Sequence, residues 1–255
     1  MNPVFQQTQY RARFDWGPAG ADAIAVGTAF VAVIDVLSFT TALTVAVEHG
    51  IAVLPYRWRD DSAAEAAGTH GAALAVGRSM AGPAEISLSP ASISRAVAQH
   101  PVERLVLPSP NGSTISARLA EAGATVVGVS LRNAAAAGTW VRERAGERPV
   151  AVIAAGERWP DGSLRPAIED LWGAGAFLDG FDDLSPEAGV AVAAYRSVAD
   201  DLPTALANAA SGRELIVQGF RADVDVAGEA GASSVVPVLQ DGWFSAAAVV
   251  EATGR

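Results

Sequence analysis

Short apolar runs alternate along most of the chain with Ala-rich segments of helical composition, and this alternation is what most constrains the fold. Several of the runs are continuously apolar, which is typical of strands buried on both faces of a sheet. The predicted strands cover residues 31–36, 51–55, 72–76, 104–107, 125–129, 150–154 and 234–239. The predicted helices cover residues 41–49, 62–69, 92–99, 114–122, 133–144, 168–178, 186–199 and 203–209. This order predicts a three-layer α/β/α fold with a mostly parallel or mixed sheet.

The alternation weakens near residue 180, where helical segments follow one another before a last strand. We therefore expect residues 1–180 to form the main α/β unit and to carry the active-site edge. Residues 181–255 either complete that fold with helical segments and a returning strand or form a smaller second lobe. A chain of 255 residues is long enough for both arrangements.

Composition excludes several classes of partner. A net charge of −10 argues against nucleic-acid binding, which needs a basic face. The absence of cysteine excludes disulfides, thiolate metal sites and a cysteine nucleophile. Neither a membrane-spanning run nor the apolar core of a secretory signal is visible, so we expect a cytoplasmic protein without a membrane partner. A homodimer is the default assembly, because it is the commonest closed oligomer.

The strand predicted at residues 31–36 ends near a single acidic residue, Asp35, and Ser38, Thr40 and Thr41 follow where the next helix should begin. A carboxylate beside a helix N-terminus can hold a cation and an anionic group together. Asp35 could also be a simple helix cap, and the threonines could be capping residues. We favour the functional interpretation of Asp35, because a lone acid at the end of so apolar a strand needs a partner.

Other polar residues follow the later strands, and ligands of open α/β sheets bind beyond the carboxyl ends of strands. Asn111-Gly112 alone is a common turn dipeptide, but before Ser113 and a helix it could form an anion nest of backbone N–H groups. Arg78 is a surface cation or a phosphate anchor. The remaining strand-end residues that we single out are Asn133, Glu169 and Asp170.

Glu169 and Asp170 lie in the first turn of a predicted helix, where the helix dipole alone favours acids. They could equally supply one metal ligand and one supporting or basic group. Glycine-rich dinucleotide loops, Walker motifs and the G-x-S-x-G elbow are absent from the sequence. Leu37 occupies the position where aspartyl phosphatases need a second acid. These exclusions leave metal-assisted chemistry on a small anionic substrate, with a divalent cation held on carboxylates.

The order of short motifs along the chain resembles that of the 2-phosphosulfolactate phosphatases, magnesium-dependent phosphatases of coenzyme M biosynthesis. The similarity runs from about residue 31 to residue 239, and it lies in the order of the motifs more than in any single one. The motifs are Asp35-Val36-Leu37 with Thr40-Thr41, Gly77-Arg78, Leu88-Ser89-Pro90, Pro110-Asn111-Gly112-Ser113, Leu131-Arg132-Asn133, Ala155-Gly156, Glu169-Asp170, Gly212-Arg213-Glu214-Leu215, Asp223–Val226 and Val236-Pro237.

The resemblance implies an α/β/α fold and Mg²⁺-dependent hydrolysis of a phosphorylated 2-hydroxy acid. It places Asp35, Glu169 and Asp170 at the metal as catalytic residues, with Asp170 or Glu169 positioning or deprotonating the attacking water. On this interpretation the phosphate and substrate are bound by Ser38, Thr40, Thr41, Arg78, Asn111, Gly112, Ser113 and Asn133.

One departure from the family pattern motivates alternatives. Ser38-Phe39 stands where the related enzymes have Arg-Ala, and an arginine there would be a natural partner for phosphate or carboxylate. One alternative is a catalytically degenerate protein that binds a small anion or has a regulatory role. Another is a different hydrolase or a lyase that acts on a phosphorylated acid.

Overall fold

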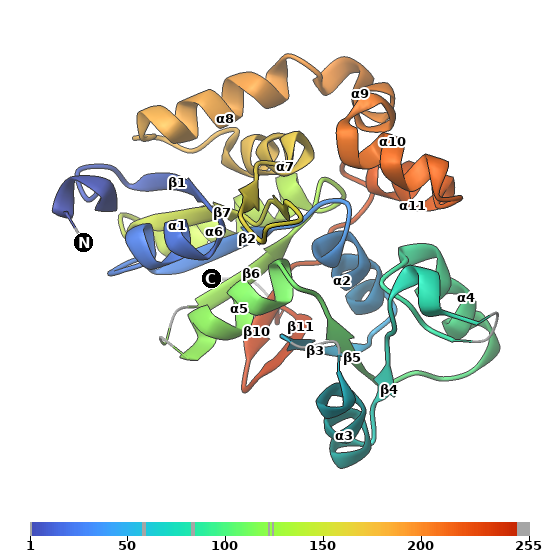
Figure 1. The fold of residues 1–255 in the computed structure, drawn as a ribbon. Coiled ribbons are helices and arrows are strands. Elements are labelled where there is room, and N and C mark those ends of the chain that lie inside the picture. The colour runs from blue at the N-terminus through green and yellow to red at the C-terminus, as the bar shows by residue number, and fades with distance from the viewer. Residues whose placement is uncertain (1, 58–59, 83–84, 122, 124, 249–255) are drawn as a thin grey trace, which may run out of the picture.

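The structure is a computed structural model that describes residues 2–57, 60–82, 85–121, 123 and 125–248. It confirms the α/β class, because a nine-stranded mixed sheet spans the described part of the chain and helices pack on both of its faces (Figure 1). The strand order is β1-β7-β2-β6-β10-β11-β3-β5-β4. None of the described helices is long and apolar enough to cross a membrane.

One half of the sheet is parallel and contains the strand that precedes Asp35. Its register places Ile34 beside Val129 and Ala154, so the segments that follow these three strands leave from the same edge. In order across the sheet, the strands are β1 (Ala12–Trp16), β7 (Val150–Ala154), β2 (Phe30–Ile34) and β6 (Thr125–Val129).

The other half is also parallel, and a C-terminal hairpin joins it to the first. Because β6, β10, β11 and β3 pair antiparallel in succession, β3 and β5 run opposite to β2. The sheet therefore lacks the single edge that a fully parallel arrangement would have. The strands are β10 (Pro237–Gln240), β11 (Trp243–Ala246), β3 (Ala52–Tyr56), β5 (Arg104–Pro108) and β4 (Ala73–Leu74).

Two helices pack across one face of the sheet and contact strands of both halves. α2 (Phe39–Glu48) packs against β6, β11 and β3, and α5 (Gly112–Glu121) packs against β2, β6 and β3. Val31 and Val33 of β2 face these helices in one apolar core. The N-terminus of α5, which follows β5, is thereby brought to the end of β2.

The opposite face of the parallel half is covered by α6 (Ala134–Ala145), α7 (Ile168–Leu178) and α8 (Pro186–Arg196). The β2 side chains on this face belong to a second core, as the two-residue period of a strand requires. Gly173 allows α7 to approach β2 closely, because a Cβ atom there would lie 2.8 Å from side-chain carbons of Ile34 and Val36. This close packing holds the first turn of α7 beside the end of β2.

The predicted bounds of helices and strands agree best with the structure in the central elements. β6, β7 and α7 begin and end at the predicted residues. β1 and β11 were not predicted, and β1 carries the charged residues Arg13 and Asp15, which interrupt its apolar pattern. The other elements are α1 (Gly17–Ile24), α3 (Asp61–His70), α4 (Pro90–Gln99), α9 (Leu202–Asn208), α10 (Ala210–Val217), α11 (Arg221–Ala227), β8 (Glu157–Arg158), β9 (Leu164–Arg165) and the 3-10 helices η1 (Pro3–Gln6), η2 (Arg78–Met80) and η3 (Ala199–Asp201).

The C-terminal region contributes both to the sheet and to the helical cover. β10 and β11 occupy the middle of the sheet, whereas α8 to α11 pack along one side (Figure 1). The domain boundary at residue 180 stays a prediction. Residue 122, where one predicted helix ends, lies outside the described residues.

Candidate active site

Asp35 joins two strand–helix junctions. It follows β2, is buried, and its Oδ2 accepts a hydrogen bond of 2.8 Å from the N–H of Gly112, the first residue of α5. The Oγ of Ser109 lies 3.5 Å from the same oxygen, and the N–H of Phe39 at the start of α2 is a further donor. Asp35 therefore does more than cap the helix that follows it, because it also binds the N-terminus of a helix from the other half of the sheet.

The residue at position 112 must be glycine for this contact to form. A Cβ atom there would lie 2.7 Å from Asp35 Oδ2 and 2.7 Å from Phe39 Cδ1. Both neighbours are buried, so neither side chain has solvent to move into. The Asn111-Gly112 dipeptide is thus more than a turn, because its glycine allows the backbone to reach the carboxylate.

Glu169 and Asp170 lie in the first turn of α7, as predicted, but their surroundings differ. Asp170 accepts the N–H of Val36 at 2.7 Å through Oδ1 and that of Gly156 at 2.8 Å through Oδ2. It therefore holds together the loops that follow β2 and β7. Glu169 is 1% exposed, and its buried Oε1 has no hydrogen-bond partner among the described residues.

Glu157 is a fourth acid of the cluster, and sequence reasoning left it out of the candidate site. Its carboxylate accepts a 3.0 Å hydrogen bond from Asn111 Nδ2. The signal was available, because Glu157 comes soon after the end of β7, at the edge where Asp35 follows β2. Its Ala-Gly-Glu context was visible, but nothing in the sequence shows that Asn111 reaches it.

Burial and mutual repulsion raise the pKa values of Asp35, Glu157 and Asp170. Desolvation raises the pKa of Asp35 to about 6, against the lowering effect of the Gly112 and Phe39 N–H groups and of Arg78. Desolvation, followed by the charges of Asp35 and Glu169, raises the pKa of Glu157 to about 7. The same three causes raise the pKa of Asp170 well above its usual range. These acids therefore bind protons more readily than exposed acids do, and a bound cation would counter that tendency.

Several predicted phosphate ligands use their side chains to stabilise the local fold, and their role at the phosphate stays a prediction. Thr40 and Thr41 donate to the carbonyls of Asp35 and Val36 at 2.8 and 2.6 Å. Ser113 donates to a carbonyl of β5 at 2.9 Å. The Asn133 amide donates to two carbonyls, at 3.2 and 3.0 Å.

Arg78 and Ser38 are better placed to bind an anion. Arg78 Nε donates to Asp223 at 2.8 Å and Nη2 donates to the carbonyl of Leu37 at 2.9 Å, which holds the guanidinium close enough to Asp35 to lower its pKa. The hydroxyl of Ser38 makes no hydrogen bond within the described part of the chain. Asp223, which was noted only as part of a motif, is itself held by Ser89 Oγ at 2.5 Å.

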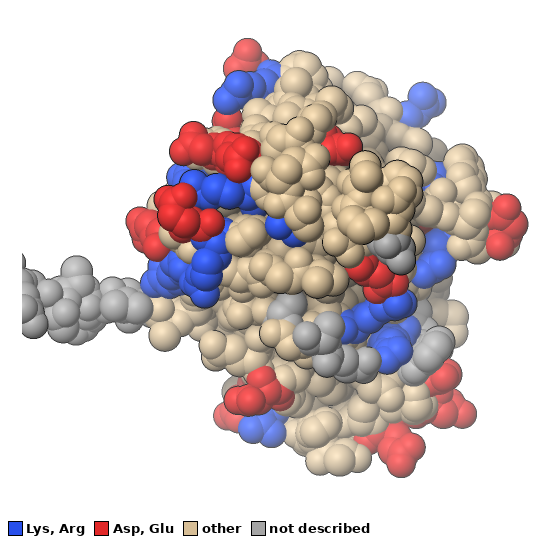
Figure 2. Space-filling model, turned by 90° about the vertical axis from the view of Figure 1, so that its left-hand side faces the viewer, with Lys and Arg blue, Asp and Glu red and all other residues tan. Residues whose placement is uncertain are grey.

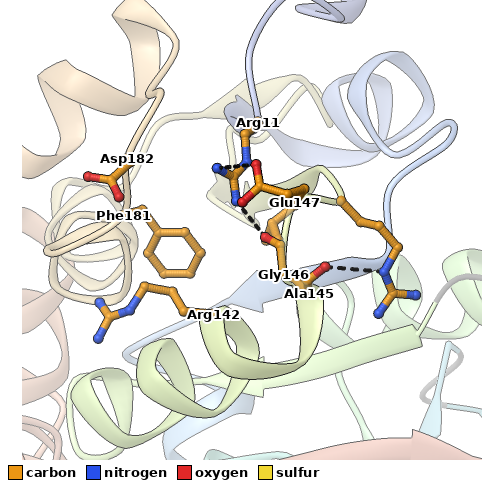
Figure 3. A pocket seen from close by; sticks show the side chains of 9 residues that line it. Arg11, Arg142, Ala145, Gly146, Glu147, Phe181 and Asp182 are labelled. Carbon is orange, nitrogen blue, oxygen red and sulfur yellow. Dashed lines mark hydrogen bonds and ion pairs between the residues drawn. The ribbon is translucent and has the colours of Figure 1, made fainter.

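A separate cavity of about 280 Å³ lies away from this cluster, between the C-terminal end of α6 and the segment after α7 (Figure 3). Its arginines contact protein groups: Arg11 forms an ion pair with Glu147 at 3.0 Å, and Arg142 lies 5.4 Å from the ring of Phe181. On the face shown in Figure 2, basic and acidic side chains are interspersed. That pattern differs from the uniformly basic surface that nucleic acids require.

The raised pKa values predict that stability falls with rising pH. Between about pH 4 and pH 7 the folded protein binds more protons than the unfolded chain, so its free energy of unfolding decreases as pH increases. We expect urea denaturation without added metal to show lower stability at about pH 8 than at about pH 5. Glu157→Gln should recover about 1–3 kcal/mol at pH 8 and little at pH 5.

The matched control is Glu65→Gln, because Glu65 is an exposed acid of α3 and its substitution changes the net charge equally. An equal gain from both substitutions would show that net charge, and not the buried cluster, causes the pH dependence.

The fold is that of an α/β protein in which buried carboxylates gather where β2, β7 and β5 end, the position at which open α/β sheets bind ligands. The model of the 2-phosphosulpholactate phosphatase family matches residues 21–242, and the chain belongs to this family. Asp35, Glu157, Glu169, Asp170 and Asp223 all lie within the matched region. Membership supports a phosphatase, that is, a hydrolase, and it confirms the resemblance seen in the motif order. A comparison with curated proteins gave no match.

Proposed function

We propose that this protein is a Mg²⁺-dependent phosphatase that hydrolyses a small phosphorylated 2-hydroxy acid at the Asp35 cluster. The observation that carries this proposal is the unpartnered, buried Oε1 of Glu169 among acids that repel one another. Burying such groups costs free energy, and a bound cation would offset that cost. A cytoplasmic location and a homodimer stay predictions.

The donor set fits Mg²⁺, because carboxylate oxygens are the ligands that this hard cation prefers. No three Asp, Glu or His side chains converge into a ready-made cage within the described ranges. Mg²⁺ does not need one, since it commonly keeps several waters and binds one or two carboxylates together with substrate phosphate. Asp35 and Glu169 would hold the ion, and when bound it would neutralise charge on the phosphate.

The other residues take roles that their contacts support. Arg78 and Ser38 bind the phosphate oxygens, and Asp223 keeps the Arg78 guanidinium oriented toward the cluster. Asp170, whose oxygens both accept backbone N–H groups, positions the loops after β2 and β7. Glu169 is the better candidate to orient the attacking water, because Oε1 is free of other bonds.

The Ser38-Phe39 departure is compatible with catalysis. The Phe39 side chain is fully buried and its ring centroid lies 6.0 Å from that of Phe244, so it belongs to the core and does not fill the site. Arg78 places a guanidinium near Asp35, and the related enzymes carry the same group on an arginine at the position of Ser38.

Phosphate release from purified protein tests the proposal. The substrates are phosphorylated lactate, 2-phosphoglycerate and 2-phosphosulfolactate, each with Mg²⁺ or with EDTA. We expect release with Mg²⁺ and a loss of release with EDTA. Thermal stabilisation by inorganic phosphate without turnover of any substrate would instead favour the anion-binding or regulatory alternative.

A further inference from the structure

We propose that the side arm of the substrate, the group carried by the phosphorylated carbon besides its carboxylate, enters a small apolar pocket beside Asn111 and Glu157. The enzyme would then prefer phosphorylated 2-hydroxy acids with an uncharged arm over those with a sulfonate arm. This inference rests on the proposed function and specifies its substrate class.

The pocket is a cavity of about 230 Å³ between α1, the first turns of α5, the end of β7 and the β8–β9 hairpin. Most of its wall is aliphatic. The apolar lining residues are Pro18, Ala19, Ile115, Ala155 and Leu164. This volume lies below the range of about 300–1,000 Å³ typical of drug-sized ligands, so it suits a short arm.

The pocket adjoins the carboxylate cluster through two of its own lining residues. Asn111 directly precedes Gly112, whose N–H binds Asp35, and its amide donates to Glu157. Glu157 also lies close enough to Asp35 and Glu169 for their charges to raise its pKa. A substrate whose phosphate lies at Asp35 would therefore direct one substituent toward this pocket.

The lining of the pocket does not favour a second anion. Glu157 and Arg158 both line it, so one acidic and one basic side chain offset each other and leave no net positive charge to attract a sulfonate. Arg158 keeps its charge, but its Nη1 is held by the carbonyl of Gly162 at 3.2 Å within the same hairpin. An aliphatic wall would also strip water from a sulfonate without replacing its hydrogen bonds, whereas a methyl group gains from burial there.

A second cavity near the cluster is more polar. It has a volume of about 380 Å³ and is lined by Arg78, Arg95 and serines of the α4 N-terminal region, together with Glu85 and with Asp223, which pairs with Arg78. A sulfonate arm would fit that cavity better, so the two pockets make opposite predictions about the substrate.

The ratio of kcat/KM for phosphorylated lactate to that for 2-phosphosulfolactate, measured with Mg²⁺, tests the inference. We expect a ratio of about tenfold or more in favour of the uncharged arm. A preference for the sulfonate would overturn the inference and direct the arm to the cavity beside Arg78 and Arg95.

Substitutions at Ala19 localise the effect, because this residue is exposed on α1 at the pocket and tolerates a larger side chain. Ala19→Arg should raise kcat/KM for 2-phosphosulfolactate and reduce the ratio several-fold. Ala19→Leu is the matched control, since it adds bulk without charge and should leave the sulfonate substrate disfavoured. An unchanged ratio in Ala19→Arg would contradict the location of the arm.

Binding to the Asp35→Asn variant, measured by calorimetry, distinguishes failure of this inference from failure of the proposed function. If Asp35→Asn binds phosphorylated lactate tenfold more tightly than 2-phosphosulfolactate, but the wild-type protein hydrolyses neither, the pocket is supported and the phosphatase proposal is overturned. If the wild-type protein hydrolyses both acids with equal kcat/KM and Asp35→Asn binds them equally, the pocket alone is overturned.

Discussion

Asp35→Asn should lower kcat/KM for the phosphorylated acid by about 100-fold or more while the fold is retained. The asparagine keeps an oxygen that can accept the Gly112 N–H, so the link between the β2 and β5 junctions can persist. It loses the negative charge that would hold Mg²⁺ opposite the phosphate. Phosphate release at saturating Mg²⁺, with circular dichroism as a check of folding, measures both effects.

The control for this variant is Asp22→Asn, which removes an aspartate charge from an ion pair of 2.6 Å with Arg118, where both partners are partly exposed. We expect no change in turnover from that substitution, because such surface pairs contribute little. Turnover by Asp35→Asn at the wild-type level would refute the assignment of Asp35.

Asp170→Asn should have the largest effect on stability, a loss of about 2–4 kcal/mol in the free energy of unfolding. The two carboxylate oxygens accept the N–H groups of Val36 and Gly156 in a buried site. An asparagine offers one acceptor, so its NH₂ group would face one of these donors and leave it unsatisfied. Urea denaturation at about pH 6 measures the change.

Glu169→Gln is the matched control, since the two residues are adjacent, equally buried and part of the same cluster. Glu169 Oε1 has no partner to lose, so this substitution should leave stability unchanged or increase it, whereas it should lower activity and raise the Mg²⁺ concentration that activity requires. Equal destabilisation by both substitutions would contradict the division of roles between the two acids.

The prediction from sequence was most accurate where local patterns are strong. β6 and β7 are largely apolar runs, α7 has two acids in its first turn before an apolar stretch, and the bounds of all three were predicted correctly. β1 was missed, because Arg13 and Asp15 interrupt its pattern and its place beside β7 depends on tertiary packing. The position of Asp35 at a strand end was also predictable, since a long apolar run ends there.

The contacts between strand ends could not be predicted in the same way. The hairpin β10–β11 enters the middle of the sheet, so β3 and β5 run opposite to β2. The contact of Gly112 with Asp35 therefore depends on strand pairings between residues more than a hundred positions apart in the chain. The difference between Glu169 and Asp170 is equally hidden, because adjacent residues in one helical turn point to different partners. Glu157 and Asp223 acquire their roles only through Asn111 and Arg78, which lie in other elements.

The amino-acid pattern was thus sufficient for the α/β class, for the position of Asp35 at the end of a strand and for the family, because burial periodicity and motif order are properties of the chain itself. Only the tertiary structure separated Glu169, with a free oxygen, from Asp170, with both oxygens bound, and brought the α5 N-terminus to Asp35. The physical reason is that hydrogen-bond partners and desolvation are set by which segments meet in space, and local sequence does not encode those meetings.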